Sequence, residues 1–163
     1  MADLDVSSLQ LSDLLSLQVD IFEEFRARKI TRTDNIPTGD LSEFIFCKTF
    51  GWEIADNSQK GYDDVSNTQD RIQIKGRRCN NHNKSRQLSA IRDLGSFDTL
   101  AAILYKHDYT IMRAALIPAE MVKEYARYQK HTNSYIFMLR DSIFDDCRVE
   151  DVTNRLAKTM REL

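Results

Sequence analysis

The stretch KGYDDVSNTQDRIQIKGRR, Lys60 to Arg78, decides the fold because it has the pattern of two short strands around a polar turn. Ile72 and Ile74 alternate with polar residues, which is the period of a strand with one apolar and one polar face. The residues Asn67 to Asp70 between the strands have the composition of a turn. The stretch is therefore predicted to form a β-hairpin.

A hairpin that folds back symmetrically about Thr68 places Asp63 opposite Gln73, and opposed residues have Cβ atoms roughly 4.5–5.5 Å apart. Lys75 lies two positions further on and points the same way. Asp64 is the alternative acid, because a one-residue change of register exchanges it with Asp63. An acid, an amide oxygen and an ammonium group thus converge on one patch. Such oxygen ligands suit Mg²⁺, and a neighbouring lysine can orient a water or a phosphate.

Two short motifs in this stretch resemble those of a known family. Gly61-Tyr62-Asp63 followed by Gln73-Ile74-Lys75 resembles the Asp…(Asp/Glu/Gln)-x-Lys signature of the PD-(D/E)xK, or restriction-endonuclease-like, nuclease superfamily, in a Gln form similar to that of Mrr-like restriction nucleases. The resemblance covers about residues 40–124. It implies an α/β fold with a restriction-endonuclease-like core, in which helices flank a central mixed β-sheet. The family pattern of glycine, apolar residue and aspartate favours Asp63 over Asp64.

The resemblance also implies a role for each residue of the signature. Asp63 would bind Mg²⁺ or Mn²⁺ directly, Gln73 would supply its side-chain oxygen, and the Ile74 backbone carbonyl would be a further metal ligand. Lys75 would orient the attacking water or the scissile phosphate. Glu43, on the first core helix, would support the metal through water or hold a second ion. Because a glutamine is neutral, metal affinity should be lower than with glutamate at this position.

Glu43 also has a purely structural interpretation. Asp40-Leu41-Ser42-Glu43 has capping-box spacing, with an acid at the N-cap and Glu three residues later. The helix is predicted to run to Phe50 and to end at Gly51, the usual left-handed terminator. The two roles of Glu43 are compatible.

The segment from Gly76 to Arg92 has five basic residues and no acid, although the formal net charge of the chain is −2. Asparagine, serine and glutamine side chains between them can donate hydrogen bonds to phosphates or base edges. We expect this loop to contact DNA in a salt-dependent way. The predicted contacts are Arg77, Arg78, Lys84 and Arg86. The alternative interpretation is a solvated loop.

The remaining elements are predicted from apolar periodicity and turn residues. An amphipathic helix over residues 9–30 is expected to pack against the sheet, or alternatively to mediate dimerisation. Further strands and helices complete one domain over residues 1–163: an edge strand at 52–55, buried strands at 97–105 and 110–117, a helix from 118 to about 129, a strand at 134–139 and a closing helix at 149–163.

Composition and cysteine use limit the class of protein. With 42 % hydrophobic and 29 % charged residues, the chain resembles a soluble globular domain. Three widely spaced cysteines, Cys47, Cys79 and Cys147, argue against a disulfide framework or a zinc cluster and suit a reducing cytoplasm. No apolar run has the length of a membrane span, and the first residues lack the pattern of a secretion signal. We therefore expect a cytoplasmic protein without a membrane partner or an organic cofactor.

These observations predict a metal-dependent endonuclease that hydrolyses DNA phosphodiester bonds, of the restriction or defence type. Cutting both strands with a compact enzyme favours a homodimer. The alternative is a catalytically inactive, nuclease-fold subunit that binds DNA or plays a structural role. That subunit would bind DNA in a salt-sensitive, Mg²⁺-independent way without cleaving it. A third hypothesis is a protein-interaction module that binds neither metal nor nucleic acid.

Overall fold

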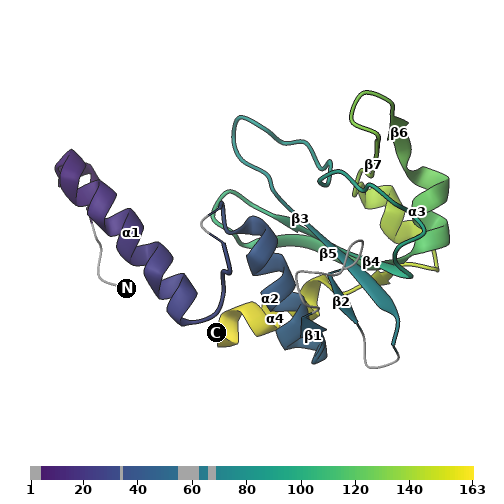
Figure 1. Cartoon of the computed structure of the whole chain (residues 1–163), viewed down its shortest axis with the longest axis horizontal. Coiled ribbons are helices and arrows are strands. Elements are labelled where there is room, and N and C mark those ends of the chain that lie inside the picture. Colours follow the sequence, from purple (N-terminus) through teal and green to yellow (C-terminus); the bar gives the residue numbers. More distant parts are fainter. Residues whose placement is uncertain (1–4, 34, 55–62, 66–68) are drawn as a thin grey trace.

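The computed structural model describes residues 5–33, 35–54, 63–65 and 69–163, with the backbone alone for 54, 64 and 65. The architecture is mixed α/β, with helices flanking a central mixed sheet (Figure 1). No helix in these ranges is both long enough and apolar enough to cross a bilayer. The predicted motif residues Gly61 and Tyr62, and the turn at 66–68, lie outside the described residues.

Among the described residues, six strands form the central sheet, in the order β1-β2-β3-β4-β5-β8. The β3–β4 pair is parallel, and the other neighbours are antiparallel. The strands are β1 (Glu53–Ile54), β2 (Asp64–Val65), β3 (Arg71–Arg78), β4 (Thr99–Tyr105), β5 (Ile111–Pro118) and β8 (Glu150–Asp151). The predicted edge strand and the two predicted buried strands are therefore confirmed.

The register of β2 on β3 is the predicted one. Asp64 pairs with Ile72 and Val65 with Arg71, which is a hairpin symmetric about position 68. One step further out, the Asp63 N–H donates to the Ile72 carbonyl at 2.8 Å. This bond is offset by one residue from the symmetric register, but the Asp63 side chain still accepts a hydrogen bond from Gln73, the predicted partner.

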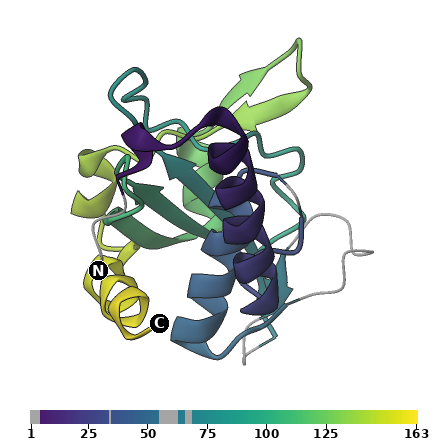
Figure 2. The same cartoon turned by 90° about the vertical axis from the view of Figure 1, so that its left-hand side faces the viewer.

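The two faces of the sheet carry separate cores. Ile72 and Ile74, which are 3 % and 4 % exposed, pack beneath α2 (Thr38–Phe50) and α4 (Thr153–Glu162). The opposite face is covered by α3 (Ala119–Tyr125) and by the segment between β3 and β4 (Figures 1 and 2). Because strand residues alternate between faces, Gln73 and Lys75 project on the α3 side, away from α2.

The start of α2 differs from the predicted capping box. The helix begins at Thr38, after Pro37, so Asp40 lies inside its first turn rather than at the N-cap. The Asp40 carboxylate instead accepts the backbone N–H groups of Arg32 and Thr33, at 2.8 and 3.0 Å. The predicted end is confirmed, because Gly51 adopts the left-handed conformation with φ 70° and ψ 30°.

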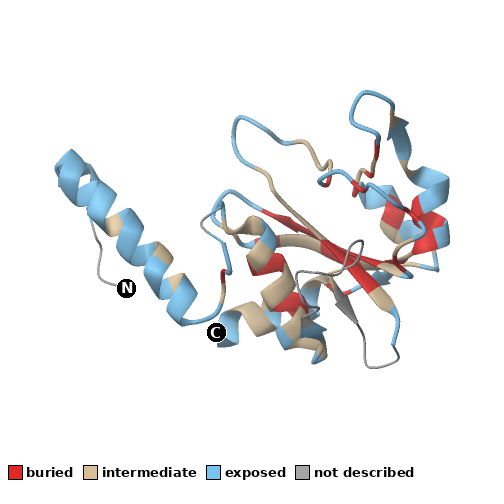
Figure 3. Ribbon diagram, in the orientation of Figure 1, coloured by how far each residue is buried: buried red, intermediate tan, exposed pale blue. Residues whose placement is uncertain are grey.

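The N-terminal helix does not pack against the sheet, so that prediction was wrong. Helix α1 (Leu11–Ala27), preceded by the short 3₁₀ helix η1 (Val6–Ser8), extends away from the rest of the molecule (Figure 1). It has no buried residue, and its apolar stripe remains exposed (Figure 3). Amphipathicity predicts that a helix has an apolar face, but not which surface covers that face.

The C-terminal part contains an additional small ribbon. The helix predicted to reach residue 129 ends at Tyr125, and β6 (Arg127–Gln129) then pairs with β7 (Ser134–Ile136) apart from the central sheet. The Tyr128 and Tyr135 rings, 5.3 Å apart, pack across this ribbon. The 3₁₀ helix η2 (Asp141–Asp145) and strand β8 follow, so the closing helix α4 begins at Thr153 rather than at residue 149.

Candidate active site

The Asp63 carboxylate is the centre of a polar cluster on β3. Its Oδ2 atom accepts the Ile74 backbone N–H at 2.7 Å and a hydrogen bond from the Gln73 side-chain amide. The same oxygen lies 4.0 Å from Lys75 Nζ. The structure thus brings together the acid, the amide and the ammonium group that the sequence predicts. Asp63, the acid that the family pattern favours, makes these contacts.

The local backbone explains this arrangement. The Asp63 N–H donates to the Ile72 carbonyl, which lies on the β2 side of β3. This bond places the Asp63 side chain beside the Ile74 N–H, the next backbone N–H of β3 on that side. The N–H and C=O of one strand residue point toward the same neighbour, so the Ile74 carbonyl is directed to the same edge. A carboxylate, an amide and a backbone carbonyl therefore lie along one short piece of strand edge.

The cluster is partly shielded from solvent. Gln73 is 8 % exposed, and the side chains of Lys75 and Asp63 are 19 % and 25 % exposed. Partial burial strengthens the attraction between the carboxylate and the ammonium group relative to a surface pair. Both charged groups nevertheless keep some contact with solvent.

No model of a known protein family and no curated protein sequence matches this chain. The chemistry of the cluster is therefore argued from its geometry. Its oxygen atoms are hard ligands of the type that Mg²⁺ and Mn²⁺ take. Within the described ranges, no group of three or more His, Cys, Asp or Glu side chains is placed to hold a metal ion. One carboxylate with neutral oxygen donors would thus rely on water to complete the coordination, as is common for Mg²⁺.

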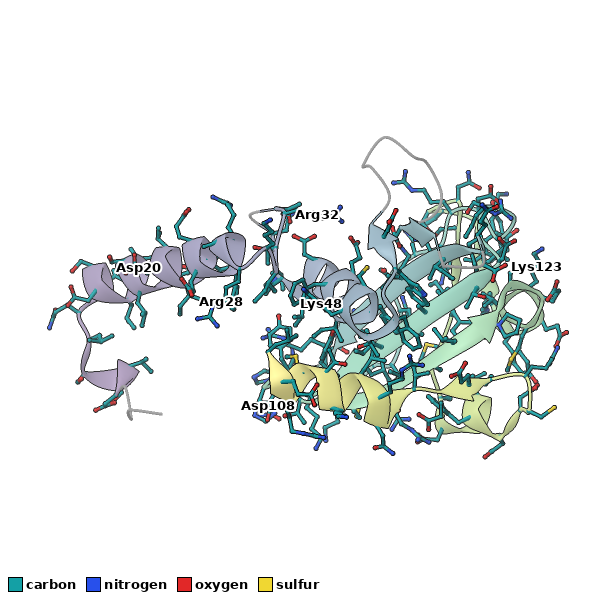
Figure 4. All side chains as sticks on the ribbon, turned by 90° about the horizontal axis from the view of Figure 1, so that it is seen from below. Asp20, Arg28, Arg32, Lys48, Asp108 and Lys123 are labelled. Atoms are coloured by element: carbon teal, nitrogen blue, oxygen red, sulfur yellow. The ribbon has the colours of Figure 1, made fainter. Side chains whose placement is uncertain are left out.

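Glu43 has a different environment. It forms an ion pair with Arg32, in the segment between α1 and α2, and its side chain is 16 % exposed. Figure 4 shows Arg32 at this junction, beside α2. Arg32 also donates its backbone N–H to Asp40, so the two acids of α2 fasten the preceding segment to the helix. The predicted capping-box role of Glu43 was wrong because the helix starts two residues before Asp40.

Two of the predicted DNA contacts belong to a strand instead of the loop. Strand β3 continues to Arg78, so Arg77 and Arg78 project from opposite faces of the sheet. Arg78 stacks on the Tyr109 ring, with its guanidinium 4.8 Å from the ring centroid. Arg77 buries its Nε without a hydrogen-bond partner in the described part of the chain. The two side chains therefore cannot form one continuous basic stripe.

The loop after β3 is more ordered than its composition predicts. The Asn80 side chain accepts the backbone N–H groups of His82 and Asn83, at 2.9 and 2.7 Å, so it holds a tight turn. Arg86 is paired with Asp141 at 2.7 Å. Lys84 is exposed at the surface of the loop. Of the four predicted DNA contacts, Lys84 thus retains the environment that the sequence suggests.

Two acids have structural partners that the sequence did not identify. Asp141 bridges Arg86 and Arg113, and hydrogen bonds from these two guanidinium groups lower the pKa of its carboxyl group. Asp98 accepts the Arg71 side chain and backbone, which lowers the pKa of Asp98 to about 2. Both pairs join residues that are distant in sequence, and no local pattern identifies such partners.

Proposed function

We propose that this protein is a metal-dependent endonuclease of the PD-(D/E)xK type, with a restriction-endonuclease-like core, that hydrolyses DNA phosphodiester bonds. The observation that carries the proposal is the contact of one Asp63 carboxylate oxygen with Gln73, the Ile74 N–H and Lys75. The alternating strand, the antiparallel hairpin and the motif spacing support the same assignment. Mg²⁺ or Mn²⁺ is the proposed cofactor.

Each residue of the Asp63 cluster would have a distinct role. Asp63 and the Ile74 carbonyl would hold the cation, and Gln73 would join them by turning its amide so that its oxygen, in place of its nitrogen, is presented to the cation. A bound divalent cation would polarise the phosphoryl oxygen and acidify an attacking water. Lys75 stands beside the carboxylate, where its positive charge would orient that water or compensate charge on the scissile phosphate. Partial burial keeps these side chains in place before substrate binds.

Cleavage assays on supercoiled and linear DNA test this proposal. Asp63→Ala and Lys75→Ala should each lower the metal-dependent cleavage rate by about 10²-fold or more, because each removes a group close to the reacting phosphate. The matched controls are Asp20→Ala and Lys106→Ala, which alter exposed residues far from the cluster. Parent-like cleavage by both cluster variants would show that the site assignment is wrong.

A second candidate function is a DNA-binding subunit that keeps the fold without catalysis. One observation favours it: the Asp63 oxygen already accepts two hydrogen bonds from its own chain, so the acid is satisfied without a cation. This subunit would bind DNA equally well with Mg²⁺ or EDTA and would cleave no DNA or RNA. Replacing Arg77, Arg78, Lys84 and Arg86 together should weaken that binding, and unchanged affinity would exclude their predicted role.

A further inference from the structure

A second concave site lies between the β6–β7 ribbon, the end of α3 and the start of η2. It encloses about 460 Å³, within the usual range of small-molecule pockets. Its floor is apolar, with Ile136, Met138 and Ile143, and Tyr125 stands at its wall with 55 % of its surface exposed. Two glutamines, two arginines and one serine complete the lining: Gln87, Gln129, Arg127, Arg140 and Ser142.

The charge of this cleft is unusual for the molecule. No Asp or Glu lines it, and Arg127 and Arg140 form no ion pair within the described ranges. By contrast, the arginines just outside are neutralised, because Arg86 and Arg113 both bind Asp141. Two uncompensated guanidinium groups in a hollow attract an anion, and their planar forks fit phosphate oxygens.

The walls of the cleft are held by contacts outside its lining. The Leu88 N–H donates to the Phe137 carbonyl at 3.0 Å, and the Leu139 N–H donates to the Arg86 carbonyl at 3.1 Å. The ion pair of Arg86 with Asp141, at 2.7 Å, fixes the start of η2. A cleft that is already formed loses little conformational entropy when a ligand binds.

We propose that this cleft binds one nucleotide, with its phosphate on Arg127 and Arg140 and its base against Tyr125 and the apolar floor. An aromatic side chain stacks on any base, and the glutamine amides can hydrogen-bond to base edges. Leu88 and Phe137, next to the cleft, are buried in the same core as Leu100 and Ala102, which neighbour Gln73 and Lys75 in the parallel β3–β4 pair. The cleft and the Asp63 cluster thus occupy the same side of the sheet. The nucleotide is either free or part of a single strand.

Calorimetric titration of the full chain in EDTA tests the proposal in the absence of metal. The result therefore does not depend on whether the Asp63 cluster binds a cation or cleaves DNA. The ligands are a thymidine mononucleotide, a short oligothymidylate and inorganic phosphate. We expect Arg127→Gln with Arg140→Gln to weaken nucleotide binding at least about tenfold. The matched control is Lys106→Gln with Arg161→Gln, which removes two positive charges from exposed positions outside the cleft.

Tyr125→Leu provides a second, independent variant, because the exposed ring can be removed without opening the core. It should weaken nucleotide binding while leaving the weaker binding of inorganic phosphate unchanged. Tighter binding of the mononucleotide assigns the cleft to a free nucleotide, and tighter binding of the oligothymidylate assigns it to a strand; both support the proposal. No binding of either nucleotide ligand, or parent-like binding by both cleft variants, would overturn it.

Discussion

Gln73 sets the charge of the Asp63 cluster. With a neutral amide at this position, the single negative charge of Asp63 is matched by Lys75, whose Nζ lies 4.0 Å away. A glutamate there would add a second negative charge beside Asp63, and a divalent cation would be the natural compensation.

Gln73→Glu should therefore raise the affinity for Mn²⁺ by about tenfold, the effect of roughly 1.4 kcal/mol of added attraction. Titration followed by electron paramagnetic resonance would measure it. Gln18→Glu, on exposed α1, adds the same charge away from the cluster and should leave the affinity unchanged. An affinity in Gln73→Glu no higher than in the parent would argue against a metal ligand at this position.

The Asp98–Arg71 pair makes a pH-dependent contribution to stability. The pKa of the Asp98 carboxyl group in the folded protein, about 2, lies below the ordinary value because Arg71 hydrogen-bonds to the carboxylate. A carboxyl group with a lower pKa in the folded state stabilises the fold when the pH is above its unfolded-state pKa of about 3.9. This stabilisation is lost as the pH falls toward the folded-state pKa. Asp98→Asn should consequently lose less stability than the parent between about pH 5 and pH 2, as urea unfolding midpoints would show. Equal losses in both proteins would contradict this role.

At the same scale, the Asp63 cluster was predictable because strand alternation and a symmetric turn together determine which side chains face each other. The partner of Glu43 was not predictable. Arg32 comes eleven residues earlier in the chain, in a segment whose path depends on where α2 begins. Local propensity does not determine that start to within a turn.

Among the elements, α2 and β3 lie close together at Gly76. A Cβ atom there would lie 2.0 Å from Ser42 Oγ and 3.1 Å from the Thr38 carbonyl oxygen. Ser42 cannot move freely, because it donates to that same carbonyl at 2.6 Å. The glycine between the signature lysine and Arg77 therefore permits the helix to lie against the strand that carries the site.

Gly76→Ala should destabilise the fold by about 1–3 kcal/mol, the usual effect of overpacking. Gly39→Ala is the matched control, because no atom lies within 4 Å of the added methyl group. This control should be neutral or stabilise α2 by up to about 1 kcal/mol, since alanine favours a helix. Chemical denaturation of both variants would measure the difference, and equal stabilities would show that the contact at Gly76 is not tight.

Sequence patterns predicted the long strands more completely than the short ones. Strands β3, β4 and β5 were predictable because long apolar or alternating runs specify them. The β6–β7 ribbon was predicted only in part: the strand predicted at 134–139 contains β7, but β6 was assigned to the preceding helix because its three residues are too few for a period to emerge. Its pairing depends on the Tyr128–Tyr135 contact, which joins separate segments. The cleft beside the β6–β7 ribbon was not predicted from the sequence for the same reason.

For the whole molecule, helix α1 is the main element whose apolar residues are left exposed by the described part of the chain. Leu11, Leu15 and Val19, at successive turns, are 72 %, 55 % and 59 % exposed. The charged residues of α1 gather toward its other end, where Glu23 pairs with Arg26 and Glu24 pairs with Arg28. We infer a homodimer in which two α1 helices pair through their exposed apolar residues.

Sedimentation velocity would test the dimer. Leu15→Glu should convert it to a monomer, while Ser16→Glu, with the same charge one position along, should not. Deleting residues 1–22 should also give a monomer. Its free energy of unfolding should lie within about 0.5 kcal/mol of that of the monomeric Leu15→Glu protein, because α1 has no buried residue. A parent protein that sediments as a monomer at all concentrations would refute the inferred dimer.

The central claim is that β2 and β3 bring Asp63, Gln73 and Lys75 together to bind a divalent cation. Anomalous diffraction from crystals soaked in Mn²⁺ tests it most directly, because the signal locates the ion itself. We predict a peak within coordination distance of the Asp63 carboxylate, with the Gln73 amide oxygen turned toward it, and no peak in crystals of Asp63→Asn. A parent structure with no ion there, and with Asp63 still bound to the Gln73 and Ile74 nitrogens at high Mn²⁺, would contradict the claim.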